Sequence, residues 1–390
     1  MPWKESVVMD ERMKFVGRLL EGEKMAELCR EFGISRKTGY KFFQRYKDVG
    51  IVGLTDRARR PIRYANQLPT QLKSEILRIK REKPSWGAPK IREIIRRKYP
   101  EVKIPAKSTI HSILDQHDLV KRRKNRRFKA EGTPLSVSYH PNDLWCADYK
   151  GEFMLANKQY CYPLTITDFA SRFLLTCEGL ESNCEVLAFS IFEQVFQKYG
   201  LPKAIRTDNG VPFSSPCALF GLSKLSVWWL RLGICIERIK PGNPQQNGRH
   251  ERMHLTLKKE ATKPPGQNLL QQQERFDLFI DEFNTQRPHQ ALGMKYPNEI
   301  YTYSPRPYKG IQELRYPFHD RTATVTNCGR VCFNKKKISL SKALAGQDIG
   351  IKETEDGIWL VSFMDYDLGY FDLETQKLEP LGYPFAPEIV

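Results

Sequence analysis

Apolar positions recur at helical spacing in two neighbouring segments near the start of the chain. Met25, Leu28 and Cys29 form a stripe at i, i+3 and i+4, the spacing of one helix face. Gly33 stands where a helix would end in a left-handed residue, and Ser35 is a favourable N-cap for a second helix. The pattern predicts a helix, a tight turn and a helix over residues 23–50, and the second helix is expected to pack inward through Tyr40, Phe43 and Tyr46.

The other face of this second helix is almost entirely cationic or amide. This composition favours a helix-turn-helix domain, whose second helix enters the DNA major groove, over an ordinary helical hairpin with a charged face. The residues predicted to contact DNA are Arg36, Lys37, Thr38, Lys41, Gln44 and Arg45.

Three more helical patterns follow a basic linker at residues 55–61. They lie within residues 68–120 and are separated by prolines and a glycine. We predict a second helix-turn-helix domain, either with or without a wing. Two DNA-reading domains in series suggest a long recognition site.

From residue 141 the pattern changes to short runs rich in apolar and aromatic residues, which is typical of strands. A helical pattern at 183–200 and a helical insert near 215–230 interrupt them, and a charged helix follows residue 247. Strands alternating with helices in this order predict a mixed α/β sheet with helices packed on it. Residues 311–390 read as hairpins, from which we expect a small C-terminal β-barrel. This region contains Lys335, Lys336 and Lys337, which form either a phosphate-binding patch or an exposed hairpin turn.

The net charge of +18 lies in the first third of the chain. Residues 1–140 hold 34 Lys and Arg against 16 Asp and Glu, whereas the remainder is balanced. Such asymmetry points to a polyanionic partner, by default nucleic acid. The segment KRRKNRRFK at 121–129 is predicted to bind backbone phosphates rather than to read bases, through Arg122, Arg123, Lys124, Arg126 and Arg127.

Composition argues against several other classes of protein. The chain has no run of eighteen apolar residues and no apolar signal core at its start, so we expect neither a membrane span nor secretion. Its nine cysteines lack dense spacing and are expected to be reduced thiols of a cytoplasmic protein.

Three acids stand where a rigid sheet can present side chains to a ligand. Asp148 interrupts an apolar strand, Asp208 ends another strand before an Asn-Gly turn, and Glu251 begins the helix after the loop PGNPQQNG. Carboxylates are the ligands that Mg²⁺ prefers, and two such ions can activate an attacking oxygen and stabilise a leaving oxygen of a phosphodiester. Asp168 is a rival acid whose alternative role is to fix a turn with Ser171 and Arg172.

The neighbours of these acids carry a family resemblance. WCAD at 145–148, RTDNG at 206–210 and GNPQQNGRHE at 242–251 resemble the three signature blocks of DDE transposases of the retroviral-integrase superfamily, in particular those of bacterial insertion sequences. NTQRPHQALG at 284–293 resembles the segment that closes their catalytic core. One departure is the 42-residue spacing between Asp208 and Glu251, longer than in many relatives, and the excess is assigned to residues 215–230.

The resemblance implies a ribonuclease-H-like core in which Asp148, Asp208 and Glu251 bind two Mg²⁺ or Mn²⁺ ions. The implied reaction is hydrolysis at the transposon 3′ ends, followed by attack of the freed 3′-OH on target DNA. Since two DNA ends must be joined in one event, a homo-oligomer of at least two chains is also implied.

Further DNA contacts are expected around the third acid. Glu251, His254, Leu255 and Lys258 share one helix face, whereas Met253 and Leu257 should pack inward. His254 and Lys258 are therefore placed to contact phosphates, and Asn209, Gln246 and Asn247 are weaker candidates.

The sequence as a whole predicts a multidomain α+β protein. The expected domains are helix-turn-helix domains at 1–60 and 61–130, a ribonuclease-H-like mixed-sheet core at 131–305 and a β-barrel at 306–390. Two alternatives to a transposase stay open: a catalytically inactive DNA-binding protein or repressor on the same scaffold, and a metal-dependent nuclease without strand transfer.

Overall fold

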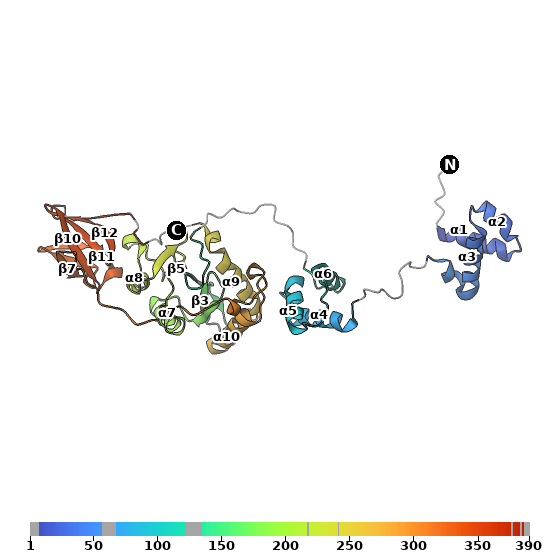
Figure 1. Cartoon of the computed structure of the whole chain (residues 1–390), viewed down its shortest axis with the longest axis horizontal. Coiled ribbons are helices and arrows are strands. Elements are labelled where there is room, and N and C mark those ends of the chain that lie inside the picture. Colours follow the sequence, from blue (N-terminus) through green and yellow to red (C-terminus); the bar gives the residue numbers. More distant parts are fainter. Residues whose placement is uncertain are drawn as a thin grey trace. The chain divides into compact units, whose positions relative to one another are not determined.

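The computed structural model describes residues 8–56, 68–121 and 135–385, apart from positions 217, 241, 376 and 383. The chain divides into two compact units, Met1–Pro69 and Thr70–Val390 (Figure 1). Each unit is described by itself below. No helix in the described part of the chain is both long and apolar enough to cross a bilayer.

The first unit is a small helical bundle. It contains α1 (Val8–Leu20), α2 (Met25–Glu31), α3 (Arg36–Val49) and a 3₁₀ turn, η1 (Gly50–Leu54). Gly33 has a φ of 64° between α2 and α3, and the Ser35 side chain accepts a hydrogen bond from the Thr38 amide. The predicted helix, turn and helix are confirmed, and α1 is an additional helix that the pattern did not single out.

One inward-facing residue of α3 was predicted wrongly. Phe43 and Tyr46 pack against the core of this unit, but Tyr40 is 59% exposed. Gly39 faces the core instead, and a Cβ at that position would lie only 2.7 Å from Cys29 Sγ. The absent side chain lets α2 and α3 approach closely, which rotates Tyr40 outward.

The second unit begins with α4 (Thr70–Glu82), α5 (Ala88–Lys98) and α6 (Lys107–Gln116). Buried aliphatic residues such as Ile76, Ile91 and Ile110 fill the space between them. The three predicted helices are confirmed. No strand occurs in residues 68–121, so the described part of this segment has no wing.

A mixed sheet forms the centre of the second unit. Its strands are β1 (Leu144–Tyr149), β2 (Phe153–Met154), β3 (Tyr160–Asp168), β4 (Leu174–Leu180), β5 (Ala204–Thr207) and β6 (Cys235–Arg238). The order is β2-β3-β1-β5-β6, with β4 paired to β3. The pairs β1–β3 and β3–β4 are antiparallel, whereas β1–β5 and β5–β6 are parallel.

Helices cover both faces of this sheet. Trp145 and Ala147 of β1 share a core cluster with α7 (Glu185–Tyr199) and α8 (Lys224–Arg231). The opposite face packs against α9 (Gly248–Glu260) and α10 (Leu269–Thr285), whose Met253, Leu257 and Phe276 are buried. Residues of β1 therefore alternate between the two helical layers, and Asp148 falls on the α9 side.

The C-terminal region contains seven further strands. They are β7 (Arg321–Thr324), β8 (Arg330–Phe333), β9 (Lys336–Ser339), β10 (Asp348–Glu355), β11 (Ile358–Phe363), β12 (Tyr366–Asp372) and β13 (Leu378–Pro380). Five of them form a sheet of order β13-β12-β11-β10-β7, and β8–β9 is a separate hairpin. Lys335 has a φ of 62° in the turn of that hairpin.

The expected closed β-barrel is not what the described residues form. The edge strands β7 and β13 do not pair with each other, so the five-stranded sheet is open. Hairpin signals predict which strands exist and which neighbours pair, but closure requires pairing between strands far apart in sequence.

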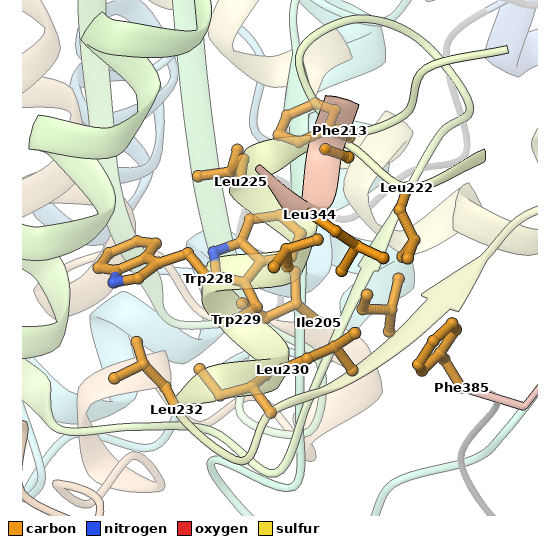
Figure 2. Packing of buried hydrophobic residues seen from close by; sticks show 14 of the residues in the cluster. Ile205, Phe213, Leu222, Leu225, Trp228, Trp229, Leu230, Leu232, Leu344 and Phe385 are labelled. Carbon is orange, nitrogen blue, oxygen red and sulfur yellow. The ribbon is translucent and has the colours of Figure 1, made fainter. Parts of the chain in front are cut away.

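The C-terminal sheet shares its core with the central sheet. Leu344 and Phe385 lie in one apolar cluster with Trp229 of α8 and Ile205 of β5 (Figure 2). Trp228 and Trp229 are 8% and 0% exposed, so neither indole is free to clamp DNA or a partner.

Candidate active site

The first acid, Asp148, stands near the end of β1 and is paired in register with Thr165 of β3. Its side chain is 22% exposed. Burial first, and then the negative charges of Asp208 and Glu251, raise the pKa of Asp148 to about 7. The charges of Asp208 and Glu251 both act on Asp148, so both of these acids lie within electrostatic range of it.

Asp208 follows β5 directly, and β5 lies parallel to β1. Its Oδ1 accepts a hydrogen bond of 3.1 Å from the Gly210 amide. A Cβ on Gly210 would lie 3.0 Å from Asp208 Oδ2, closer than side chains normally tolerate. Glycine at 210 therefore lets the Asn-Gly turn fold back over the carboxylate and fix its orientation.

The loop that carries Glu251 is held by a buried ion pair. Arg206 of β5 and Glu237 of β6 are in register, and Arg206 Nε donates to Glu237 Oε2 at 2.7 Å. The same guanidinium donates to the backbone oxygens of Gln246 and Ser136. Both charged side chains are almost fully buried. The pair therefore ties the sheet to the turn η3 (Pro244–Asn247), after which α9 begins.

Glu251 itself is exposed in the first turn of α9. A carboxylate there is favourably placed next to the unpaired backbone amides of a helix N-terminus. Met253 and Leu257 pack inward, as predicted, which turns Glu251 and Lys258 to the accessible side of the helix. The first turn of α9 thus places an acidic group near the sheet edge where Asp148 and Asp208 lie.

Two histidines of α9, His250 and His254, are buried close to Asp148. Thr165 Oγ1 donates to the Asp148 carbonyl oxygen and lies 2.8 Å from His250 Nε2 and 2.7 Å from His254 Nε2. Because the hydroxyl hydrogen is used on Asp148, Thr165 accepts from both rings, which assigns both as Nε2–H tautomers. His250 Nδ1 then accepts from the Thr167 hydroxyl at 2.8 Å.

The structure places His254 differently from the sequence expectation. The side chain is buried, and burial followed by the charge of Lys150 lowers the pKa of His254 to about 3. A neutral, enclosed ring is not available as a cationic phosphate contact. Its Nδ1 instead faces Asp148 Oδ2 at 3.7 Å. Lys258 is exposed and stays available for the phosphate role.

Other predicted contacts also have structural partners. Asn209 Nδ2 donates to the Ile239 carbonyl, and Gln246 Oε1 accepts from the Lys240 amide. Asn247 is 4% exposed, so it is not an open surface contact. Asp168 fixes a turn, since its oxygens accept from the Asn142 amide and from the Ser171 amide and hydroxyl.

The predicted DNA-binding side of α3 is accessible. Arg36, Lys37, Lys41 and Gln44 are exposed, and Thr38 and Arg45 are half-buried. The basic residues predicted to bind phosphates after residue 121 lie outside the described part of the chain. They are Arg122, Arg123, Lys124, Arg126 and Arg127.

Sequence reasoning missed His250 and Thr165. The spacing of His250 and His254 was a usable signal, because residues four apart lie on the same helix face and both flank Glu251. Thr165 gave no signal, since its role depends on a contact with residues 85 or more positions away.

Comparison with known families places two kinds of domain on this chain. Residues 138–244 and 232–297 match models described as "Integrase core domain". Residues 11–62 match a "Helix-turn-helix domain", and residues 38–114 match a "Homeodomain-like domain".

The curated relatives include insertion-element and retroviral proteins. An uncharacterized 39.2 kDa protein of insertion element IS476 from Xanthomonas euvesicatoria is 24% identical over 279 residues, covering 70% of this chain and 77% of the relative. An uncharacterized 31.7 kDa protein of IS407 from Burkholderia multivorans is 24% identical, and the match covers 46% of this chain and 62% of the relative. The Gag-Pol polyprotein of baboon endogenous virus is 33% identical over 104 residues, only 6% of its length.

Solved structures with some similarity include retroviral integrase domains. The HTLV-2 integrase catalytic core domain in complex with magnesium is 18% identical, covers 42% of this chain and 98% of its own, and has a TM-score of 0.33. The catalytic core domain of BIV integrase is 21% identical, with coverages of 41% and 93% and a TM-score of 0.32.

Proposed function

Because the chain carries an integrase core domain and helix-turn-helix domains, we propose that it is a transposase of an insertion element. In this proposal it binds the element's ends, cleaves the DNA at their 3′ ends and transfers these ends into target DNA. Asp148, Asp208 and Glu251 form the catalytic site. The observation that carries the proposal is the arrangement of the three acids, with Asp148 on β1, Asp208 directly after the adjacent parallel strand β5, and Glu251 in the first turn of α9.

Three carboxylates with little compensating positive charge among the described residues fit the binding of a divalent metal ion. Lys150 is the only cation among the main influences on the pKa of Asp148, and its effect is smaller than those of burial, Asp208 and Glu251. Hard cations such as Mg²⁺ prefer oxygen ligands and are commonly held by carboxylates together with substrate phosphate. We propose two Mg²⁺ or Mn²⁺ ions, held by Asp148, Asp208 and Glu251.

The two histidines do not make a competing metal site. His250 and His254 come close enough to Asp148 for their ligand atoms to lie within 4.8 Å of one another. Both ring nitrogens of His250 are, however, engaged by threonine hydroxyls, and Nε2 of His254 is engaged by Thr165. Only His254 Nδ1 is directed toward Asp148.

The residues of the chain supply binding and orientation for the reaction. Asp148 and Asp208 are fixed by two adjacent strands, and Glu251 is fixed by α9. Lys258 lies two turns further along the same side of α9, where its ammonium group can bind a phosphate next to the scissile bond. When bound, the metal ions would activate the attacking oxygen, first of water and then of the DNA 3′-OH, and stabilise the leaving oxygen.

DNA recognition is assigned to α3 and to the helices of residues 68–121. The exposed face of α3 is cationic or amide, the composition that base edges and phosphates require. We further propose that the active species contains at least two chains, because two DNA ends must be joined in one event. No distinct observation favours a nuclease or an inactive binding protein.

The test uses plasmid DNA that carries the coding sequence with its native flanks. The full-length protein is incubated with Mg²⁺, and strand ends and joined products are mapped. Asp148→Asn, Asp208→Asn and Glu251→Gln are each expected to abolish cleavage and joining while DNA binding is kept. Specific binding without any cleavage in Mg²⁺ or Mn²⁺ would overturn the catalytic proposal, and cleavage without joining would reduce it to a nuclease.

A further inference from the structure

A cavity lies beside the candidate active site, on the same face of the sheet. Its volume is about 490 Å³, and its floor includes Cys146 of β1 and Thr167 of β3. Cys146 and Asp148 are two residues apart on one strand, so they project from the same face roughly 7 Å from each other. The cavity is therefore a close neighbour of the three acids without containing them.

One wall of this cavity is a basic stripe of α9. Arg249, Arg252, Thr256 and Lys259 all line it. They follow one another at intervals of three, four and three residues, which places them on one side of the helix. Glu251 and Lys258 lie on the adjoining exposed side. A strand that crosses the exposed surface of α9 can reach both the acids and the cavity.

The facing wall contributes two more arginines. Arg172 follows the turn that Asp168 and Ser171 close, and it has a φ of 61°. Its Nε is buried and has no hydrogen-bond partner within the described part of the chain. Arg287 is 7% exposed and is paired with Glu260 at 2.7 Å.

The acids of the cavity leave most of its cations without a counter-charge. Asp168 is already saturated by the hydrogen bonds of its own turn, and Glu260 is engaged by Arg287. Among the described residues, no carboxylate lies within ion-pair distance of four lining cations, namely Arg172, Arg249, Arg252 and Lys259. Burial, and then the like charge of Arg249, lowers the pKa of Arg172. The fold thus gathers positive charge that an anion would stabilise.

We propose that this cavity binds a phosphate of the DNA backbone, at a position on the strand away from the scissile phosphate. Arginine forks match the geometry of phosphate oxygens and bind them with paired hydrogen bonds. The buried Nε of Arg172 supplies a donor that has no acceptor among the described residues. The inference rests on the proposed function, because it assumes that DNA lies along α9 during the reaction.

The test measures binding by full-length protein that carries Asp148→Asn, so that no cleavage interferes. Arg252→Ala with Lys259→Ala removes two exposed cavity cations that have no ion-pair partner in the described structure. Fluorescence anisotropy then gives the DNA association constant at several salt concentrations. Loss of one phosphate contact is expected to make the slope of log K against log salt shallower by about 0.9. Arg172→Gln, which removes the charge of this half-buried side chain, should act in the same direction.

Two controls keep the result specific. Lys224→Ala removes an exposed cation of α8 that is not part of the cavity, and its slope should equal that of the parent protein. Thermal unfolding curves should coincide for all variants used. An unchanged slope in both cavity variants, with normal unfolding, would overturn the proposal.

Two DNA substrates distinguish where the phosphate comes from. One is a duplex that carries the element's end, and the other is a duplex of unrelated sequence that stands for target DNA. If the salt slope changes only on the duplex that carries the element's end, the cavity binds end DNA. If it changes only on the unrelated duplex, the cavity binds target DNA. Failure of the cavity proposal is separable from failure of catalysis. In the first case the wild-type enzyme cleaves DNA while the slopes of the cavity variants are unaffected, and in the second the slopes change although the wild-type enzyme does not cleave.

Discussion

Nδ1 of His254 faces Oδ2 of Asp148 at 3.7 Å. The tautomer set by Thr165 leaves a lone pair on this nitrogen, so two acceptors point toward each other. Such an arrangement is stabilised by a proton on Asp148 or by a cation nearby. The neutral, buried His254 therefore adds to the stabilisation that a cation near the three acids would provide.

We expect His254 to act as a positioning residue for Asp148. His254→Leu keeps a buried side chain of similar bulk but removes the contacts to Thr165 and Asp148. Partners that orient metal ligands typically contribute 10- to 100-fold to metal affinity, so the Mg²⁺ concentration for half-maximal cleavage should rise by about that factor. Leu278→Ala, at an exposed position of α10, should leave it unchanged. An equal Mg²⁺ requirement in all three proteins would contradict this role.

The raised pKa of Asp148 should make the metal-free protein less stable as the pH rises. An aspartate in the unfolded chain titrates near 4, whereas burial and then Asp208 raise the pKa of folded Asp148 to about 7. Between these values the folded state holds a proton that the unfolded state has released, so the free energy of unfolding falls. Each pKa unit corresponds to about 1.4 kcal/mol.

Urea unfolding in EDTA at pH 5 and pH 7.5 tests this for wild type and Asp148→Asn. His254 acts in the opposite sense over part of the range, since burial lowers its pKa to about 3. The difference between the two proteins is therefore the quantity to compare. The stability advantage of Asp148→Asn over wild type should be larger at pH 7.5 than at pH 5, by about 2–3 kcal/mol. The same difference at both pH values would refute the assignment.

The sequence placed the three acids because their positions follow local rules. A polar residue at a strand end or in the first turn of a helix can be recognised from neighbouring residues, as for Asp208 before Asn209-Gly210. The open C-terminal sheet and the hydrogen bond between His254 and Thr165 depend instead on contacts between segments that are distant in the sequence. Tyr40 shows the same limit at short range, since helical periodicity alone did not reveal that Gly39 would occupy the inward position.

The buried pair of Arg206 and Glu237 should be essential to stability. Glu237→Gln leaves the Arg206 guanidinium enclosed without its counter-charge, and breaking such a pair typically costs about 3–5 kcal/mol. The free energy of unfolding from urea titration measures the loss. Lys203→Ala breaks an exposed ion pair to Asp143 and should change it by less than about 0.5 kcal/mol. Comparable losses in the two variants would argue against a special role of burial.

The shared core predicts that the C-terminal sheet does not unfold separately from the central sheet. Leu344 is fully buried against the α8 layer that contains Trp229 (Figure 2). Leu344→Ala should therefore destabilise the central sheet, by about 2–5 kcal/mol as for other buried leucines. Tryptophan fluorescence follows the change, since Trp228 and Trp229 report on the central unit and Trp359 of β11 reports on the C-terminal sheet. Leu381→Ala, at a partly exposed position, is the control. A variant that loses only a separate C-terminal transition would show that the two sheets are independent.

The exposed face of α3 predicts two separable effects on DNA binding by full-length protein carrying Asp148→Asn. Lys41 is a simple cation, so Lys41→Ala should weaken binding to every sequence and reduce the salt slope by about 0.9. Gln44 can pair with adenine edges, so Gln44→Ala should relax the preference for a particular base at one position, with a loss of about 1–3 kcal/mol on the preferred site only. Lys24→Ala, which alters an exposed residue before α2, should do neither. If Lys41→Ala and Gln44→Ala both left binding unchanged at every salt concentration, α3 could not be the recognition helix, and the helices of residues 68–121 would carry recognition instead.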